Sequence, residues 1–542
     1  MPVKSTTTAS TVPRLLADAA ERYGDHPAVV DGDIRVGYRR LADFVETAAR
    51  AFTAVGVRPG DRVAVWLPNR LEFILALLGA QSAGAVAVPM NTRYRGREAA
   101  DILKRSRAVA LVMADGFLGN GYLDMLRAAA AEARGTDAAG TGPVPGLSHL
   151  RTVVDAGTGT PPGGSLSWTG FTSLAERVPP ERAARIAAAV GPDDVCDILF
   201  TSGTTGLPKG VMSSHRQTVG VGRVWAEGAA MTSDDRYGIV NPFFHSFGYK
   251  AGFIAAFTAG ATVHPVQVFD AGQVLELIQT ERISVLPGAP TLFLSLLGHP
   301  RVEEFDTSSL RFATCGAATV PTLLFRRMRE ELGFRTVAQA YGLTECVVAT
   351  RSRPGEDPEH VAETTGPAVP GLEIRVVGPD GRGMAMGEDG EILLRGDLVT
   401  CGYFEDEEAT RAAFDAEGWF RTGDVGRLDE HGCLKITDRL KDVITVGGFN
   451  VYPAEVENVL CSHPDVEEAA VVGVPDDRMG SVPCAHVVPR RGASPSADAL
   501  VDYCADRLAN FKVPRRVVLT PVLPRNPSGK ILKTALRDAS PT

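Results

Sequence analysis

The chain has 542 residues, which is more than one hydrophobic core usually supports, so two or more domains are expected. Its net charge of −9 disfavours a general nucleic-acid binder, which would normally carry a basic stripe. With 44% apolar and 22% charged residues it has an ordinary globular composition.

Other features of the composition exclude further classes. No uninterrupted apolar run reaches the roughly 20 residues that a membrane-spanning helix needs. The eight cysteines are scattered, with no CxxC pair and no short His/Cys cluster, so neither a zinc site nor a disulfide framework is indicated. The first ten residues are rich in Ser and Thr and lack the apolar region of a signal peptide. We therefore expect a soluble, reduced, cytoplasmic protein.

The first third of the chain alternates between strand and helix patterns. Helices are expected over residues 12–23, 38–55 and 73–82, and strands over 28–30, 62–67, 85–89 and 108–113. This rhythm is typical of a parallel sheet covered by helices. Between residues 134 and 168 the pattern dissolves into Gly, Pro, Ser and Thr, which predicts a long surface excursion.

The rest of the chain changes character twice. Alternation of strand and helix resumes over residues 217–332. Residues 366–428 contain short strands separated by Gly and Asp turns, which predicts a small β-rich subdomain. About 100 residues from position 441 onward mix α and β patterns.

A turn rich in glycine and hydroxyl residues follows an apolar strand at residues 195–200. From Thr201 to Gly210 it holds four hydroxyl residues, three glycines and Lys209. Small residues let the backbone approach a polyphosphate closely, and the hydroxyl and N–H donors surround it. Pro208 and Gly210 exclude the Walker A pattern, which needs Gly before the lysine and Ser or Thr after it. A plain Gly/Thr-rich surface loop has a similar composition.

Three later stretches carry side chains suited to a nucleotide. Tyr341 can stack on a base, Thr344 can bond an α-phosphate, and Glu345 can hold Mg²⁺ against phosphate oxygens. Gly316, after a strand, leaves room for a flat ring against the backbone. Asp424, on a tight turn, can accept hydrogen bonds from two ribose hydroxyls.

Residues 241–250 join aromatic side chains, His245 and two helix-breaking residues. Taken alone, His245 suits a structural core histidine better than a catalytic base. Lys250 has two interpretations, a counter-charge for a polar or anionic substrate or an ordinary solvated lysine.

Taken together, these stretches resemble the adenylate-forming enzymes, which include acyl-CoA synthetases, beetle luciferases and peptide-synthetase adenylation domains. The resemblance covers about residues 12–532, with six signatures in the family's order. It implies an α/β fold with a large N-terminal domain, residues 1–440, of two doubly wound sheets plus a β-barrel-like subdomain. A small mobile α+β C-terminal domain, residues 441–542, would follow. A homodimer is typical of the family.

The resemblance also implies roles for individual residues. The phosphates of ATP would contact Thr201, Ser202, Gly203, Thr204, Thr205 and Lys209. AMP would contact Gly316, Ala317, Ala318, Tyr341, Gly342, Asp424 and Arg439. The acyl pocket would include His245, Phe247, Gly248, Tyr249 and Lys250. Catalytic roles would fall to Lys530, Thr344, Glu345 and His245, with His245 in substrate binding rather than proton transfer.

The C-terminal domain would supply the remaining parts. Lys441 aligns with the hinge on which this domain rotates between two half-reactions, and Gly447, Gly448 and Phe449 would line a tunnel for the thiol of CoA. Two adjacent glycines let a thin pantetheine arm pass close to the backbone. Asn526 replaces the family's commoner threonine near Lys530.

The implied reaction joins a carboxylic acid and ATP into acyl-AMP and pyrophosphate, with Mg²⁺, and then transfers the acyl group to CoA. Residues 241–250 and 447–457 look most like ligases for fatty acids, in lipid metabolism, and for propanoate side chains of steroid rings. Three alternatives stay open. These are an enzyme for an aryl or biosynthetic acid whose acceptor is a carrier protein, an amine or nitrite, a luciferase-like oxygenase, and a non-catalytic nucleotide-binding relative. No GxSxG motif supports a serine thioesterase.

Overall fold

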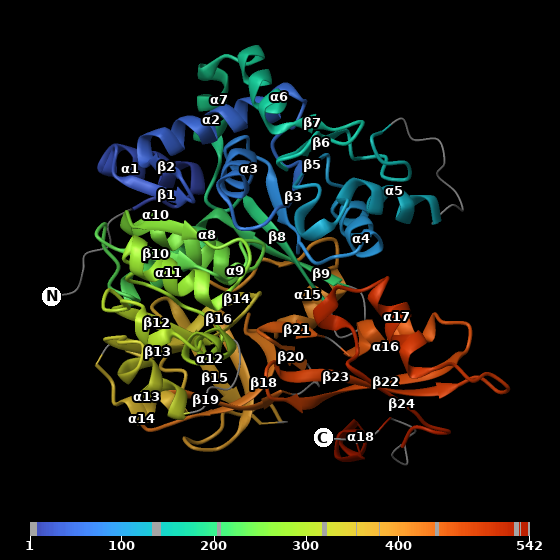
Figure 1. Ribbon diagram of the computed structural model, residues 1–542. Helices are drawn as coiled ribbons and strands as arrows, with labels where there is room; N and C mark the ends of the chain where they lie inside the picture. Colours follow the sequence, from blue (N-terminus) through green and yellow to red (C-terminus); the bar gives the residue numbers. More distant parts are fainter. Residues whose placement is uncertain are drawn as a thin grey trace.

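The computed structural model describes residues 8–132, 142–202, 208–316, 322–353, 355–378, 380–439, 444–451, 453–524, 531 and 533–539. A large N-terminal domain fills the upper part and the lower left of Figure 1, and a smaller domain, drawn in orange and red, lies against it at the lower right. This arrangement agrees with the expected α/β fold of two unequal domains.

The first sheet of the N-terminal domain has eight strands. They are β3 (Arg62–Trp66), β4 (Val86–Pro89), β5 (Ala110–Met113), β6 (Thr152–Asp155), β7 (Leu166–Ser167), β8 (Val195–Ser202), β9 (Pro208–Ser214) and β17 (Gly402–Tyr403). Their order is β17-β9-β8-β4-β3-β5-β6-β7. All pairs from β8 to β7 are parallel, whereas β9 is antiparallel to both β8 and β17.

Helices cover this sheet, and the first of them confirm the sequence pattern. The helices are α1 (Val12–Tyr23), α2 (Tyr38–Ala54), α3 (Leu71–Ser82), α4 (Gly96–Ser106), α5 (Tyr122–Glu132), α6 (Trp168–Ser173), α7 (Pro180–Ala189) and α8 (His215–Gly228), with 3₁₀ turns η1 (Phe117–Gly119) and η2 (Leu174–Arg177). The hydroxyl of Thr11 accepts the N–H of Arg14 at the start of α1, where Pro13 suits the first turn. α3 is apolar around its whole circumference and is almost completely buried.

The expected surface excursion over residues 134–168 is wrong in part. Strands β6 and β7 lie within it and extend the large sheet, with β6 parallel to β5. Val153 and Val154 are buried there. These strands are only four and two residues long, too short to stand out in a segment rich in Gly and Pro.

The second sheet is built from two hydrogen-bonded groups. Its strands are β1 (Pro27–Asp31), β2 (Ile34–Gly37), β10 (Arg236–Ile239), β11 (Thr262–Pro265), β12 (Phe312–Gly316), β13 (Thr336–Leu343) and β14 (Cys346–Arg351). The orders are β10-β11-β1-β2 and β12-β13-β14. Val285 bridges Tyr237 of β10 and Phe312 of β12, so the two groups form one continuous surface.

Helices and one irregular turn accompany the second sheet. They are α9 (Ser246–Gly248), the π-helical turn η3 (Tyr249–Ile254), α10 (Ala255–Ala259), α11 (Ala271–Glu281), α12 (Pro290–Leu297), the 3₁₀ turn η4 (Val302–Glu304), α13 (Thr322–Glu330) and α14 (Pro358–Glu363).

The β-rich subdomain is a four-stranded antiparallel sheet in the order β15-β16-β18-β19. Its strands are β15 (Leu372–Val377), β16 (Gly390–Gly396), β18 (Phe420–Leu428) and β19 (Leu434–Arg439), with helix α15 (Glu407–Ala413) between β16 and β18. The subdomain extends past residue 428 because β19 completes a hairpin with β18.

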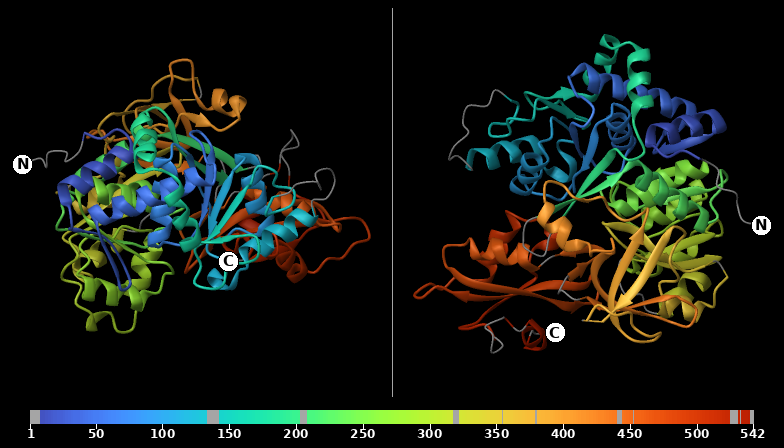
Figure 2. Two further views of the ribbon diagram at one scale, coloured as in Figure 1. Left: turned by 90° about the horizontal axis from the view of Figure 1, so that it is seen from above. Right: turned by 180° about the vertical axis from the view of Figure 1, so that it is seen from behind.

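The C-terminal domain has its own sheet and core. Its elements are β20 (Ile444–Val446), β21 (Phe449–Val451), α16 (Pro453–Cys461), β22 (Val466–Asp476), β23 (Gly480–Pro489), α17 (Ala497–Ala505), the 3₁₀ turn η5 (Asn510–Lys512), β24 (Arg516–Leu519) and α18 (Lys533–Ala539). Val471, Val487 and Leu500 belong to a core cluster separate from those of the N-terminal domain. Figure 2 shows this domain projecting to one side of the molecule. Within the described part of the chain, no helix is both long and apolar enough to cross a bilayer.

Candidate active site

The β8–β9 hairpin carries the predicted phosphate loop. Its tip, residues 203–207, lies outside the described residues, and with it the predicted Gly203, Thr204 and Thr205. The flanks are held in register, because Thr201 pairs with Lys209 and Ser202 with Pro208 across the antiparallel ladder. The described flanks therefore lie at the carboxyl end of β8, the edge where ligands of parallel sheets usually bind.

Lys209, Glu345 and Tyr403 meet beside this hairpin although they come from three distant segments. The Tyr403 hydroxyl donates to Oε1 of Glu345 at 2.9 Å. The Lys209 ammonium lies 4.7 Å from the centroid of the Tyr403 ring. Burial raises the pKa of the Glu345 carboxyl, although the hydrogen bond from Tyr403 and the charge of Lys209 act in the opposite direction.

Tyr341 and Asp424 form a second polar contact. The Tyr341 hydroxyl donates to Oδ2 of Asp424 at 2.6 Å. Asp424 is 5% exposed and pairs across the β18–β19 ladder with Arg439, whose side chain is outside the described part. The predicted base-stacking ring and the predicted ribose carboxylate are thus neighbours.

Two predicted glycines lie where the backbone comes close. Gly316 pairs with Ala340 in the parallel β12–β13 ladder, one residue before Tyr341. A Cβ on Gly342 would lie 2.1 Å from the carbonyl oxygen of Val347, so no larger residue fits there. Ala317 and Ala318 follow Gly316 outside the described residues. Thr344 is half-buried in the turn between β13 and β14.

His245 caps the short helix α9. Its Nδ1 accepts the N–H of Phe247 at 3.2 Å. The residue as a whole is exposed, but the protein packed around the imidazole disfavours its charged form and lowers the pKa of His245 to about 4. The imidazole is therefore neutral at pH 7. The half-buried ring of Phe247 meets Trp225 of α8 edge to face at 5.3 Å.

The position of Lys250 shows that both sequence-based interpretations of this residue are wrong. Its side chain is 1% exposed, and Nζ lies 2.9 Å from Oδ1 of the fully buried Asp197. The ammonium also donates to Oγ of Ser213 at 2.7 Å. Lys250 is therefore neither a solvated lysine nor a counter-charge presented to a substrate. The π-helical turn η3 directs it into the space between the β8–β9 hairpin and α8.

Tyr249 is likewise part of the interior. It is fully buried, and its hydroxyl accepts a hydrogen bond from Nε2 of Gln81 at 2.6 Å. Of the predicted acyl-pocket side chains, only His245 and Phe247 are partly open to solvent. A Cβ on Gly248 would lie 2.3 Å from the carbonyl oxygen of Asn241, which explains the glycine by close packing.

The β20–β21 turn brings the C-terminal domain against the N-terminal domain. Gly447 and Gly448 have φ values of +53° and +85°, which favour glycine. A Cβ on Gly448 would lie 3.2 Å from Cβ of Ala289, just before α12. Phe449 stacks on Phe511 with ring centroids 4.6 Å apart. The predicted hinge Lys441 and the predicted catalytic Lys530 lie outside the described residues.

Lys512 joins the two domains by a buried ionic contact. Its Nζ lies 2.9 Å from Oε1 of Glu98 in α4 and 2.6 Å from Oε1 of Glu455 in α16. The three side chains are 4%, 11% and 10% exposed. Although burial alone would lower the pKa of Lys512, the two carboxylates raise it. The lysine therefore stays charged between the domains.

Sequence reasoning missed Tyr403, Glu98 and Lys512. Tyr403 belongs to a strand of only two residues. Glu98 and Lys512 are 414 positions apart, so only the fold relates them.

Comparisons with known proteins identify the family of the chain. Residues 16–404 match the family described as AMP-binding enzyme, and residues 455–530 match the AMP-binding enzyme C-terminal domain. The chain is 49% identical over 529 residues to a 3-[(3aS,4S,7aS)-7a-methyl-1,5-dioxo-octahydro-1H-inden-4-yl]propanoyl:CoA ligase of Rhodococcus jostii (strain RHA1), with 98% of each protein covered.

A ligase of the same name from Mycobacterium tuberculosis (strain ATCC 25618 / H37Rv) is 47% identical, over 97% of this chain and 98% of that protein. Among solved structures, the amide bond synthetase McbA from Marinactinospora thermotolerans is similar with a TM-score of 0.82 and 30% identity, over 98% of this chain and 99% of that one. The chain therefore belongs to the AMP-binding enzyme family, and within it to the acyl-CoA ligases.

Proposed function

We propose that this ligase activates a propanoate side chain carried on a polycyclic, steroid-derived ring, with fatty acids as the wider class. The observation that carries the proposal is the 47–49% identity, over nearly the whole chain, to two ligases named for a propanoyl group on a methylated dioxo-octahydroindene ring. The identity extends over both domains, so the proposal does not depend on a single motif.

In the first half-reaction, the substrate carboxylate attacks the α-phosphorus of ATP, acyl-AMP forms and pyrophosphate leaves. The Tyr341 ring would lie against the adenine, and the Asp424 carboxylate would accept from the ribose hydroxyls. Their 2.6 Å hydrogen bond supports this assignment because it holds both groups in one place before the nucleotide binds. Lys209 and Lys530 would stabilise charge on the phosphates, and Thr344 would bond the α-phosphate.

Glu345 is the proposed ligand for Mg²⁺. Burial leaves its carboxylate insufficiently compensated, as its raised pKa indicates, and a bound cation would supply the missing charge. Tyr403 would orient one carboxylate oxygen through its 2.9 Å hydrogen bond. When bound, Mg²⁺ offsets the negative charge of the triphosphate.

In the second half-reaction, the thiol of CoA attacks the acyl carbonyl and AMP leaves. The pantetheine arm would pass the turn of Gly447 and Gly448. A Cβ on Gly448 would lie 3.2 Å from Cβ of Ala289, so the missing side chain leaves space between the domains, which supports this path. His245, neutral at pH 7, would line the acid's pocket rather than take a proton. The thiol proton would pass to solvent or phosphate. We also propose that the enzyme forms a homodimer and is located in the cytoplasm.

The test is pyrophosphate release across a panel of fatty, aryl and polycyclic propanoic acids, each with and without CoA. We expect release with the polycyclic acid, followed by the mass of its CoA thioester. The matched control is Lys530→Ala, which should slow acyl-AMP formation about a hundredfold or more. Release without a thioester would refute CoA as the acceptor and point to an amine, which the likeness to McbA makes the first alternative to try. Release only with fatty or aryl acids would refute the polycyclic substrate.

A further inference from the structure

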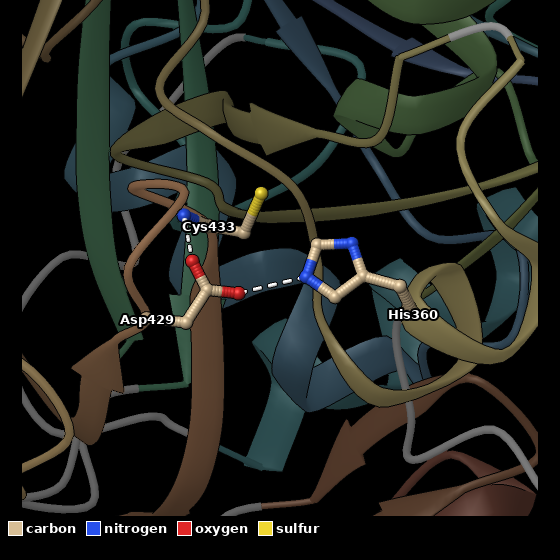
Figure 3. A group of neighbouring side chains, drawn as sticks. All are labelled: His360, Asp429 and Cys433. Atoms are coloured by element: carbon tan, nitrogen blue, oxygen red, sulfur yellow. Dashed lines mark hydrogen bonds and ion pairs between the residues drawn. The ribbon is translucent and has the colours of Figure 1, made fainter.

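Three potential metal ligands meet at a place remote from the candidate active site. His360 comes from α14, and Asp429 and Cys433 flank the turn between β18 and β19 (Figure 3). One ligand atom from each residue lies within 4.8 Å of the others. We call this group the His–Asp–Cys cluster. The cluster runs against the sequence-based expectation of no zinc site. That expectation overlooked His431 and Cys433, which are two positions apart, and it could not include His360, which precedes Asp429 by 69 positions.

The turn fixes the Asp429 carboxylate in one orientation. Oδ1 accepts the backbone N–H of His431 at 2.9 Å and of Cys433 at 2.8 Å. Oδ2 therefore faces Nε2 of His360, at 2.7 Å. Backbone donors that hold one oxygen while the other faces a ligand site are typical of the support around metal-binding carboxylates.

His431 offers a second imidazole, and so a fourth candidate ligand, next to this group. Its ring centroid is 5.6 Å from that of His360, and the two rings are nearly perpendicular. Its side chain is 65% exposed, so it can rotate without disturbing the core. His360 and Asp429 are 27% and 26% exposed, whereas Cys433 is buried, so an ion from solvent can reach the group through the imidazole and the carboxylate.

A His–Asp ion pair that only fastens the turn is the simpler interpretation. It explains the 2.7 Å contact but gives no reason for a thiol and a second imidazole beside it. Thiolate, imidazole and carboxylate together are ligands of Zn²⁺ and are unsuitable for Mg²⁺ or Ca²⁺. One thiolate and one carboxylate also balance the charge of a divalent ion, which suits a half-buried site.

We propose that His360, Asp429 and Cys433 bind one Zn²⁺ ion, with His431 as the fourth ligand. On binding, the thiol of Cys433 releases its proton to solvent, and the neutral ring of His360 carries its single proton on Nδ1, which leaves Nε2 free. The hydrogen bond between His360 and Asp429 then gives way to two bonds to the metal. The ion would join α14, beside the β12–β14 sheet, to the β18–β19 hairpin. The other end of this hairpin holds Asp424 opposite Arg439, so the site is structural and supports the nucleotide side from a distance.

The test uses the full-length enzyme, purified without a polyhistidine tag under a thiol-free reductant. After incubation with Zn²⁺ and gel filtration, elemental analysis should find about one Zn²⁺ per chain. Co²⁺ in place of Zn²⁺ should give a thiolate-to-metal charge-transfer band. A chelator should lower the melting temperature of the wild type. Cys433→Ser and His360→Gln should each lose the ion, the band and the chelator effect. Gln can still donate to Asp429, so that variant keeps the turn fastened.

The matched control is Cys461→Ser, which removes an exposed thiol from the C-terminal domain and should leave metal content unchanged. Equal metal content in wild type, Cys433→Ser and His360→Gln would overturn the proposal, as would absence of the Co²⁺ band. A His431→Asn variant that keeps full metal content would remove His431 from the ligand set, and with it the four-ligand site proposed here. Because the measurement needs no substrate, its outcome is independent of the proposed acid.

Discussion

At the scale of single residues, Tyr403 should determine the pH below which adenylation activity falls. Burial raises the pKa of Glu345 and the Tyr403 hydrogen bond lowers it, so removing the donor should raise the pKa further. A hydrogen bond to a charged group is worth about 1.5–3 kcal/mol, so Tyr403→Phe should shift the acid limb of kcat/KM for MgATP upward by about one pH unit or more. Phe keeps the ring that faces Lys209.

This shift is measured by pyrophosphate exchange between about pH 5 and 8, because the pH profile of kcat/KM reports groups of the free enzyme. Glu345→Gln is the control, since it should remove the limb together with most of the activity. If the acid limb of the pH profile is unchanged in Tyr403→Phe, Tyr403 does not control the ionisation of Glu345.

Lys250 is the second residue whose role can be tested. Lys250→Met would leave the Asp197 carboxylate buried without its partner, which costs about 3–5 kcal/mol of folding free energy. We expect a large fall in melting temperature, largely reversed by adding Asp197→Asn. If Lys250 instead faced the substrate, the KM for the acid would rise while the melting temperature stayed constant.

At the scale of elements, the β20–β21 turn should govern only the thioester step. Gly448→Ala places a Cβ 3.2 Å from Ala289 in a left-handed conformation that costs about 1–2 kcal/mol. Thioester formation from supplied acyl-AMP should slow about tenfold, while pyrophosphate exchange is spared. Gly480→Ala is the matched control, with φ of +79° in the same domain but open space around its Cβ. Equal effects of the two variants would mean that strain, and not the domain contact, is responsible.

The elements also show what a sequence can predict. α1 and α2 follow from local periodicity and end within one residue of the expected positions, because an amphipathic stripe is encoded within the helix itself. Strands β6, β7 and β17 were not predictable, since two to four residues carry no periodicity. The burial of Lys250 depends on Asp197, in a strand more than fifty positions earlier, so the motif around His245 indicates a pocket without showing which side chains face it.

At the scale of the whole molecule, the contact of Lys512 with Glu98 should hold the two domains in the arrangement described here. Glu98→Gln leaves the ammonium with Glu455 of its own domain and removes the charge contributed by the other domain. Because the contact is buried, its loss should weaken docking by more than a surface pair would, whose worth is about 0–1 kcal/mol. This docked arrangement is also the one in which Gly448 faces Ala289, so that an added Cβ would lie 3.2 Å from it.

If CoA reacts in this arrangement, Glu98→Gln should slow thioester formation from supplied acyl-AMP about tenfold or more and leave pyrophosphate exchange near the wild-type rate. Single-turnover measurements of each half-reaction separate the two effects. Glu457→Gln is the matched control, because Glu457 pairs with Lys533 at 2.6 Å within the C-terminal domain. A parallel loss in both half-reactions would show a folding defect. Faster thioester formation would show that the contact holds the domains in a resting state, from which the enzyme must depart before CoA can react.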